Sequence, residues 1–378
     1  MNLKVLHIVP WFPNPKNPIE GIFIARHIEA LQQFCENSVL HLLFGSENKI
    51  EADSYSGISV ERQSIKPLVD KWILKEKIAF KRISLHLNKY AAKYTTVVMY
   101  ITYPNAIGIE KLKKKYPLIQ FVLAEQWSAY HTNFNLSESS SGRKRIANIF
   151  HSGMPLIVVS KALGEDIRKF ANKPDLDFNV VPNIVDDTTF NYKKKDIERP
   201  FTFCSINNWS AMKNPILLID AFQILSASNK NTRLILAGSG QLDTEIKEHI
   251  KLLGLEKKII LKGRISKSEV ADLLHLSNAY CQSSNYETFS AICIEALATG
   301  TPVIATNIGG MKDFIHEKNG ILVDSMEVVK WKDAMEKIIA QYKNYNFKAI
   351  SDNCISTYNK TSVGALFYHT LLEVSSEK

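Results

Sequence analysis

The chain has 378 residues, more than one ordinary hydrophobic core accommodates, so its length favours two domains. A hydrophobic content of 45% and a charged content of 22% are typical of a globular protein and exclude a disordered or collagen-like chain. The formal net charge is +9, and the five scattered cysteines lack the close spacing of a metal site, so we expect reduced structural thiols.

The first half of the chain alternates short apolar runs with helical patterns. The opening run, residues 3–12, contains His7 and Pro10 and no cleavage site, so it predicts a buried strand rather than a signal peptide. A helix is predicted over 22–34, and further strands over 39–44, 97–101, 121–124 and 156–159. This alternation predicts parallel βαβ units in a first α/β domain, residues 1–195. Since no window is apolar enough to span a bilayer, we expect a cytoplasmic protein.

Positive charge concentrates between residues 61 and 115, where thirteen Lys or Arg accompany four Asp or Glu. Apolar and basic residues recur there at helical spacing: Leu68, Val69, Trp72, Ile73, Ile78, Ile83, Leu87, Tyr90 and Ala91, among Lys71, Lys75, Lys81, Arg82 and Lys89. This pattern predicts a basic amphipathic helix, either the solvated face of a soluble domain or a peripheral contact with an anionic membrane surface. Nucleic acid is not an expected partner, because no binding motif accompanies the charge.

A charged segment that ends in proline, residues 193–200, separates the two halves. After it, strands are predicted over 201–206, 233–237, 259–261, 279–282 and 302–305, and helices over 215–225, 242–252, 267–276 and 290–297. We therefore predict a second α/β domain over 196–355 and a C-terminal segment, 356–378, with a helix over 362–374. Two such domains bind ligands in a cleft at the carboxyl ends of their strands.

The clearest chemical signature lies in residues 286–302, YETFSAICIEALATGTP. Glu287 precedes a predicted helix, and Glu295 lies eight residues later within it. The free N–H groups of Thr288, Phe289 and Ser290 at the helix start can bind a diphosphate. Glu287 can then reach a sugar hydroxyl, and Glu295 can accept both hydroxyls of a ribose. The alternative is a capped amphipathic helix with two exposed glutamates, since Glu pairs at this spacing also arise by chance.

This segment resembles the E-x7-E motif of retaining glycosyltransferases of the glycogen-synthase-like and mannosyltransferase-like family. Neighbouring features occur in that family's order: Gly263, Ser283 and Ser284, residues 300–305, Gly309 and Gly310, the turn at 181–190 and the loop at 13–21. The resemblance covers most of the chain. It implies the GT-B architecture, two facing Rossmann-like domains with an interdomain cleft, and a C-terminal helix that crosses back to the first domain.

The resemblance also implies roles for residues of the second domain. Lys213, between a strand and a helix, would neutralise the leaving diphosphate together with the start of the Ser290 helix. Relatives usually carry an arginine five or six residues before this lysine, where the present chain has Asn207 and Asn208. Arg264 is the candidate to supply the missing positive charge. As a bare sequence feature, Lys213 would equally fit a solvated loop lysine.

Three residues of the first domain, Glu125, Gln126 and Trp127, follow a predicted strand where relatives often carry a histidine after the glutamate. Gln126 occupies that position and can hydrogen-bond a sugar but cannot relay a proton. The three residues would lie on the acceptor side, although packing at a strand end also explains them. Gly21 would let the backbone approach a ligand phosphate closely.

The sequence thus predicts a retaining glycosyltransferase that moves a sugar from a nucleotide-sugar donor to a glycan or lipid-linked acceptor, in cell-surface polysaccharide or glycolipid assembly. No cofactor and no metal are expected. Two alternatives remain open: a nucleotide-sugar epimerase on the same fold, and a non-catalytic nucleotide-sugar-binding protein. Asn208 and Gln126, where relatives carry ionisable groups, keep the second alternative in view.

Overall fold

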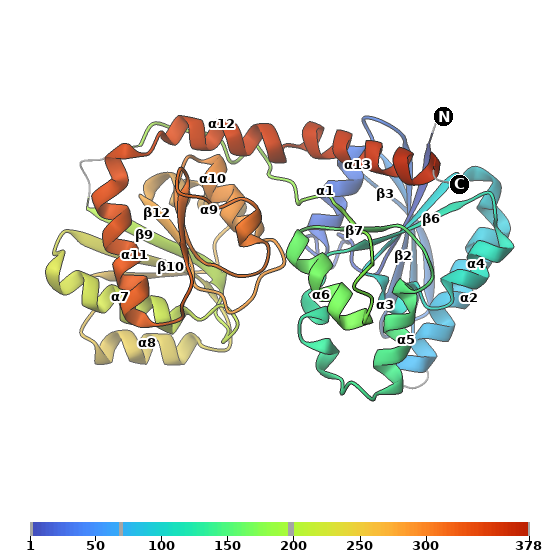
Figure 1. Cartoon of the computed structure of the whole chain (residues 1–378), viewed down its shortest axis with the longest axis horizontal. Helices are drawn as coiled ribbons and strands as arrows, with labels where there is room; N and C mark the ends of the chain where they lie inside the picture. The colour runs from blue at the N-terminus through green and yellow to red at the C-terminus, as the bar shows by residue number, and fades with distance from the viewer. Residues whose placement is uncertain (1–2, 68–70, 196–199, 377–378) are drawn as a thin grey trace. The chain divides into compact units, whose positions relative to one another are not determined.

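The computed structural model describes residues 3–67, 71–195 and 200–376. They form two compact units, Met1–Ile184 with Lys360–Lys378, and Val185–Asn359 (Figure 1). The predicted boundary after residue 195 falls within the second unit, while the predicted C-terminal helix belongs to the first. Within the described residues, none of the helices combines the length and apolar character that a bilayer-spanning segment needs.

The first unit contains an eight-stranded sheet in the order β3-β4-β2-β1-β5-β6-β7-β8. Its strands are β1 Lys4–Val9, β2 Glu36–Phe44, β3 Lys49–Tyr55, β4 Ile58–Ile65, β5 Thr96–Tyr100, β6 Gln120–Glu125, β7 Leu156–Val158 and β8 Asn179–Val180. All neighbouring pairs are parallel except β3 and β4. Strand β1 lies in the middle and is buried from Val5 to Val9, which is typical of a parallel sheet covered on both faces.

Helices on both sides of this sheet complete the first unit. They are α1 Ile22–Leu31, α2 Trp72–Tyr90, α3 Thr102–Asn105, α4 Ile109–Lys115, α5 Ser141–Phe150, α6 Lys161–Ala171 and α13 Lys360–Ser376, with short 3₁₀ turns at Ala91–Lys93, Ser128–Tyr130 and Asn133–Asn135. Helix α13 packs against α1, and Val363, Phe367 and Leu371 join the same buried core as Ile24 and Ile28. The C-terminal helix is therefore part of the first unit's core.

Helix α2 covers most of the predicted basic amphipathic segment, of which Leu68 and Val69 lie outside the described residues. Ile83 and Leu87 are buried, as the helical pattern predicts, and so is Ala79, which the predicted face did not include. Two apolar residues of the predicted face are instead half exposed, Trp72 at 49% and Ile73 at 51%. The helix therefore presents both apolar and basic side chains to solvent.

The second unit contains a six-stranded parallel sheet in the order β11-β10-β9-β12-β13-β14. Its strands are β9 Phe201–Asn208, β10 Thr232–Ser239, β11 Ile259–Gly263, β12 Ala279–Gln282, β13 Val303–Thr306 and β14 Gly320–Val323. Its helices are α7 Pro215–Ser228, α8 Asp243–Leu252, α9 Lys267–Leu276, α10 Ala291–Ala298, α11 Val328–Gln341 and α12 Phe347–Tyr358, with 3₁₀ turns at Gly309–Asp313 and Tyr342–Asn344.

Local signals explain why this unit follows its predicted elements closely. Helix α9 begins at a capping box in which the Ser266 hydroxyl accepts from the Glu269 N–H and Glu269 accepts from the Ser266 N–H. Helix α7 begins with Pro215, whose fixed φ suits a first helical turn. Because all six strands are parallel, the loops that follow their carboxyl ends share one edge of the sheet, where a ligand site is expected.

Candidate active site

Lys213 lies in the loop that connects β9 to α7, at the carboxyl edge of the second sheet. This loop is tied to the segment that follows β12. The Ser283 hydroxyl donates to the carbonyl oxygens of Lys213 and Asn214 at 3.1 and 2.9 Å, and the Asn285 N–H donates to the Met212 carbonyl at 2.8 Å. Two loops far apart in sequence are thereby held in a fixed register.

Glu287 sits in the loop after β12 and forms an ion pair with Lys213. Its Oε1 accepts hydrogen bonds from the Lys213 ammonium, from the Gln282 amide at 2.7 Å and from the Ser284 hydroxyl at 2.9 Å. Only 11% of the Glu287 side chain and 23% of the Lys213 side chain are exposed. In contrast, Glu287 Oε2 accepts from none of the described residues, so one oxygen of this carboxylate stays open to a ligand.

Gly309 fixes the position of the Glu287 backbone. Its φ is +49°, and a Cβ atom there would lie 1.7 Å from the Glu287 carbonyl oxygen. The next residue, Gly310, donates its N–H to the same oxygen at 3.3 Å. The close approach of the loop after β13 to the loop after β12 therefore requires glycine at position 309.

Helix α10 begins at Ala291 with Ser290 as its N-cap, and residues 288–290 form the short loop between Glu287 and the helix. The N–H groups of Thr288, Phe289 and Ser290 donate to no acceptor in the part of the chain that the structure describes. Ser290 has a φ of 63°, and the Phe289 ring is buried against Phe314, with ring centroids 5.2 Å apart. The Phe289 ring is thus part of the core, while the N–H groups of residues 288–290 lie in the loop directly before α10, where unpaired N–H groups suit an anion.

Glu295 lies within α10 and is partly exposed. The buried thiol of Cys293 reports on its surroundings. Burial raises the pKa of this thiol, the Ser290 hydroxyl lowers it, and the charges of Glu287, Lys213 and Glu295 all act on it. Glu287 and Lys213 therefore contact each other directly, and Glu295 follows on the helix that begins at Ala291.

Arg264 follows β11 at the same carboxyl edge, and its Nε donates to the Ser239 hydroxyl at 2.6 Å. Ser239 ends β10 and pairs in register with Asn208, the last residue of β9. Arg264 is therefore separated from Asn208 by a single residue across the strands, and both are exposed. The guanidinium therefore lies along the same carboxyl edge of the sheet as Asn208.

Glu125, in the first unit, is 1% exposed and surrounded by hydrogen-bond donors. Its two oxygens accept from the N–H groups of Thr102, Gln126 and Trp127 at 2.9 Å, from the Thr102 hydroxyl at 3.0 Å and from the Tyr130 hydroxyl at 2.8 Å. Burial raises the pKa of Glu125, and these donors oppose that rise. In this arrangement Glu125 organises the loops after β5 and β6.

Gln126 is buried and contacts His27 of helix α1. Burial lowers the pKa of His27 to about 4, so the ring is neutral, and its Nε2 donates to the Pro182 carbonyl at 2.9 Å. His27 Nδ1 then accepts from the Gln126 amide nitrogen at 3.0 Å. The Gln126 amide oxygen is buried and meets no partner among the described residues.

Trp127 and Gly21 complete the predicted residues of the first unit. The Trp127 ring packs edge-on against Trp11 and Phe134, with centroid distances of 5.5 and 4.9 Å. Gly21 has a φ of +59°, and a Cβ there would lie 2.4 Å from the Trp11 carbonyl oxygen. Gly21 thus allows the loop before α1 to fold back on the end of β1.

The structure therefore brings together Glu287, Lys213, Glu295 and the N–H groups of residues 288–290, and it places Arg264 and Asn208 along the same edge. Sequence reasoning missed two polar groups of this cluster, Gln282 as a hydrogen-bond partner of Glu287 and Ser239 as a partner of Arg264. A signal for Gln282 existed, because a polar residue closes an otherwise apolar predicted strand. Within the described ranges, no group of three His, Cys, Asp or Glu is placed to hold a metal ion.

Comparison with known proteins relates the second unit to a family. Residues 187–350 match the model of the family described as glycosyl transferases group 1. An uncharacterised glycosyltransferase of Methanocaldococcus jannaschii is 27% identical over 183 residues, 44% of this chain and 46% of the relative. A D-inositol 3-phosphate glycosyltransferase of Gordonia bronchialis is 34% identical over 140 residues, 34% of this chain and 31% of the relative. The chain thus matches less than half the length of these curated relatives.

Solved structures resemble the whole chain. Sucrose-phosphate synthase from Thermosynechococcus elongatus has a TM-score of 0.77 at 16% identity and covers 100% of both chains. The Anabaena protein HepE, in complex with UDP and glucose, has a TM-score of 0.70 at 16% identity, covering 98% of this chain and 99% of its own. The predicted α/β class and GT-B fold are thereby confirmed.

Proposed function

Residues 187–350 belong to the glycosyl transferases group 1 family, and from this premise we propose that the chain moves a sugar from a nucleotide diphosphate donor to a glycan or lipid-linked acceptor. The observation that carries the proposal is the Lys213–Glu287 pair beside the unpaired N–H groups of residues 288–290. A cation, an anion-binding helix start and an open carboxylate oxygen are the groups that a sugar diphosphate requires. The UDP and glucose bound to the similar HepE structure support this class of donor.

Lys213 acts on the leaving group in this proposal. An ammonium carries three N–H donors, and only one is needed for Glu287, so the others can reach phosphate oxygens without breaking the ion pair. Negative charge grows on the diphosphate as the bond to the sugar breaks. A cation and helix N–H groups aimed at that charge stabilise the transition state more than the bound donor.

The two glutamates position the donor. Glu287 Oε2 accepts a hydroxyl of the donor sugar, because Oε1 is already occupied by three donors. Glu295 accepts the ribose hydroxyls from within α10. Arg264, on the far side of Ser239, adds a second positive charge for the phosphates. Two cations and the N–H groups before α10 neutralise the diphosphate, so transfer proceeds without a metal. The resemblance to retaining glycosyltransferases supports retention of the anomeric configuration.

The acceptor binds to the first unit, where the Gln126 amide oxygen remains unpaired. Ile73, Lys77, Lys81 and Leu85 follow one another at four-residue spacing on exposed positions of α2, and we name them the α2 stripe. Its two basic side chains, flanked by an apolar side chain at each end, suit the surface of an anionic membrane. This supports a lipid-linked or membrane-proximal acceptor and a peripheral position on the inner face of the membrane.

The test of the proposed function is to incubate the chain with UDP-, GDP- and ADP-sugars and to follow release of the nucleoside diphosphate. We expect slow hydrolysis of one donor class in the absence of acceptor. Lys230→Ala, which changes an exposed lysine away from the site, serves as the control for Lys213→Ala. Conversion of the donor to an epimer would indicate an epimerase instead, and nucleotide binding without release from any donor would indicate a binding protein.

A further inference from the structure

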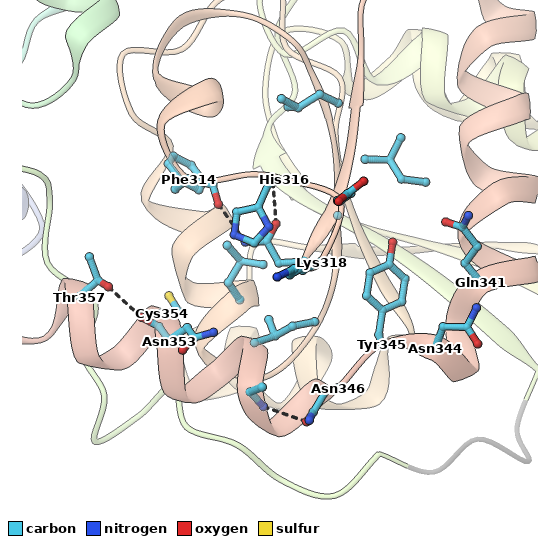
Figure 2. A pocket seen from close by; sticks show the side chains of 18 of the residues that line it. Phe314, His316, Lys318, Gln341, Asn344, Tyr345, Asn346, Asn353, Cys354 and Thr357 are labelled. Carbon is cyan, nitrogen blue, oxygen red and sulfur yellow. Dashed lines mark hydrogen bonds between the residues drawn. The ribbon is translucent and has the colours of Figure 1, made fainter.

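A cavity of about 850 Å³ lies in the second unit, apart from the candidate active site. It is lined by the loop at 313–320, by α12 and by the turn between α11 and α12, and it opens to solvent (Figure 2). That loop leads into the first residue of β14, at the amino end of the strand, whereas Lys213 and Glu287 follow the carboxyl ends of theirs. None of the proposed donor-site residues lines the cavity. Its size falls within the range of small-molecule pockets, roughly 300–1,000 Å³.

The Tyr345 hydroxyl in the cavity lining is buried and has no hydrogen-bond partner among the described residues. The Tyr345 side chain is 9% exposed, and its hydroxyl meets no partner among the residues that the structure describes. Figure 2 shows this ring extending toward the middle of the cavity, between Lys318 and Gln341. Burial raises the pKa of Tyr345, so the phenol keeps its proton. An unpaired buried hydroxyl is costly, and a ligand that accepts from it would remove that cost.

The other lining groups define the chemistry of that ligand. Gln341, Asn344 and Asn353 present amide groups, each of which donates and accepts, as the neighbouring hydroxyls of a sugar also do. Phe314 and Ile350 supply apolar walls for the C–H faces of a pyranose ring.

The charges along the lining balance, since Asp313 and Glu317 offset Lys318 and Lys337. A phosphate or carboxylate ligand would meet two acidic side chains and gain little from the lysines. A purely apolar ligand would leave the Tyr345 hydroxyl unpaired. A neutral polyhydroxylated ligand satisfies both conditions.

The walls of the cavity are held in place before any ligand arrives. Asn319 is 9% exposed, and its side chain forms hydrogen bonds with the backbone of the loop at 313–320. Its Oδ1 accepts from the His316 N–H at 2.8 Å, and its Nδ2 donates to the Phe314 carbonyl at 2.9 Å. On the opposite side, the Asn346 side chain caps α12 by accepting from the Ala349 N–H at 3.1 Å. A preformed wall lowers the entropy cost of binding.

We infer that this cavity is a second saccharide site, which binds a neutral oligosaccharide of a few sugar rings through the Tyr345 hydroxyl and the surrounding amides. The inference does not depend on the proposed function, because it uses none of the donor-site residues. The site gives the second unit a way to hold a glycan away from the edge of the sheet where the nucleotide is proposed to bind.

The test measures the binding of maltotriose, cellotriose and mannotriose to the full chain by saturation-transfer NMR and calorimetry. Inorganic phosphate serves as the anionic probe. We expect one trisaccharide to bind at millimolar concentration. Tyr345→Phe should weaken it by about two- to tenfold, as expected for one hydrogen bond. Because the hydroxyl has no protein partner, the melting temperature should not fall. Asn353→Trp, at an exposed position of α12, should fill the cavity and abolish binding.

Two controls separate this site from other causes. Tyr342→Phe makes the same chemical change three residues away, outside the lining, and should leave binding unchanged. Lys213→Ala should also leave trisaccharide binding unchanged, whatever it does to donor turnover. The inference is overturned if none of the trisaccharides binds, if Asn353→Trp binds as well as the wild type, or if phosphate competes with the saccharide.

Discussion

Lys213 and Glu287 illustrate how single side chains connect the fold to the proposed chemistry. They lie 74 residues apart in the sequence and meet because two loops at the same sheet edge are bonded through Ser283 and Asn285. The attraction within the pair, together with the hydrogen bonds from Gln282 and Ser284, offsets part of the cost of desolvating the Glu287 carboxylate.

Replacing Lys213 by alanine tests the leaving-group role. Lys213→Ala should lower kcat for donor hydrolysis or transfer by about 10²- to 10³-fold, the cost of removing one group that stabilises developing charge. KM for the donor should change much less, because Arg264 and the helix start still bind the diphosphate. Steady-state kinetics with Lys230→Ala as the matched control measures this, and an unchanged kcat would reject the role.

Glu125 is predicted to act on stability. In Glu125→Gln, one acceptor oxygen is replaced by an NH₂ group that faces donors, so the free energy of unfolding should fall by about 1–3 kcal/mol. The pKa of Glu125 is higher in the folded protein than in the unfolded chain, where it is 4.5. The contribution of Glu125 to the free energy of unfolding is therefore fully present below pH 4.5 and declines as the pH rises through the pKa of the folded protein. The deficit of Glu125→Gln should therefore shrink with rising pH.

Urea unfolding at several pH values measures this deficit. Glu138→Gln, in a solvent-exposed loop of the same unit, is the control and should match the wild type. A deficit that grows with rising pH would contradict the assigned direction of the pKa shift.

Gly309→Ala tests whether the loop after β13 sets the position of Glu287. The new Cβ would clash with the Glu287 carbonyl, so the loop must move, and we expect lower activity together with a lower melting temperature. Gly254→Ala is a matched control away from the candidate site, since Gly254 also has a positive φ of +64° but nothing lies within 4 Å of its added Cβ. Equal losses of activity in both variants would show that backbone strain alone, and not the contact with Glu287, is responsible.

At the scale of elements, local signals explain which predictions from the sequence were accurate. Helix α9 and strand β12 have the bounds that the pattern predicts, Lys267–Leu276 and Ala279–Gln282, because a capping box and a short apolar run mark them. The hairpin of β3 and β4 was missed. Strand β3, Lys49–Tyr55, lies at the sheet edge with nearly all its side chains exposed, so it carries no apolar alternation to detect.

The candidate site was predictable in its parts but not in its connections. The motif positions Glu287 and Glu295 and the loop lysine could be selected from the sequence. Their hydrogen-bond partners could not, because the contact of Glu287 with Lys213 and Gln282 depends on how three loops meet in space. The exposure of Ile73 and Leu85 on α2 likewise follows from tertiary packing rather than from the helical pattern.

The α2 stripe predicts membrane binding that depends on charge. Lys77→Glu with Lys81→Glu should weaken sedimentation with vesicles that contain anionic lipid by at least about tenfold, since each lysine near such a surface contributes about 1 kcal/mol. The wild type should lose binding as salt rises. Lys257→Glu with Lys262→Glu, two exposed lysines of the second unit, is the control. Binding that is insensitive to salt and to the α2 variant would remove the membrane contact from the account.

At the scale of the whole molecule, the two units contribute different chemistry. The second unit holds the cations, the helix start and the acidic pair at the carboxyl edge of one parallel sheet, and it is this unit that matches the family model. The first unit holds a buried polar group, the Gln126 oxygen, and a basic helix surface. Donor binding should therefore follow changes in the second unit, and acceptor and membrane binding changes in the first.

A crystal structure of the chain with the nucleoside diphosphate selected by the donor screen is the most direct test. We predict phosphate oxygens within hydrogen-bond distance of Lys213 Nζ and of the N–H groups of residues 288–290, with the ribose hydroxyls on Glu295. A nucleotide bound elsewhere on the chain, with Lys213 and the start of α10 untouched, would contradict the account.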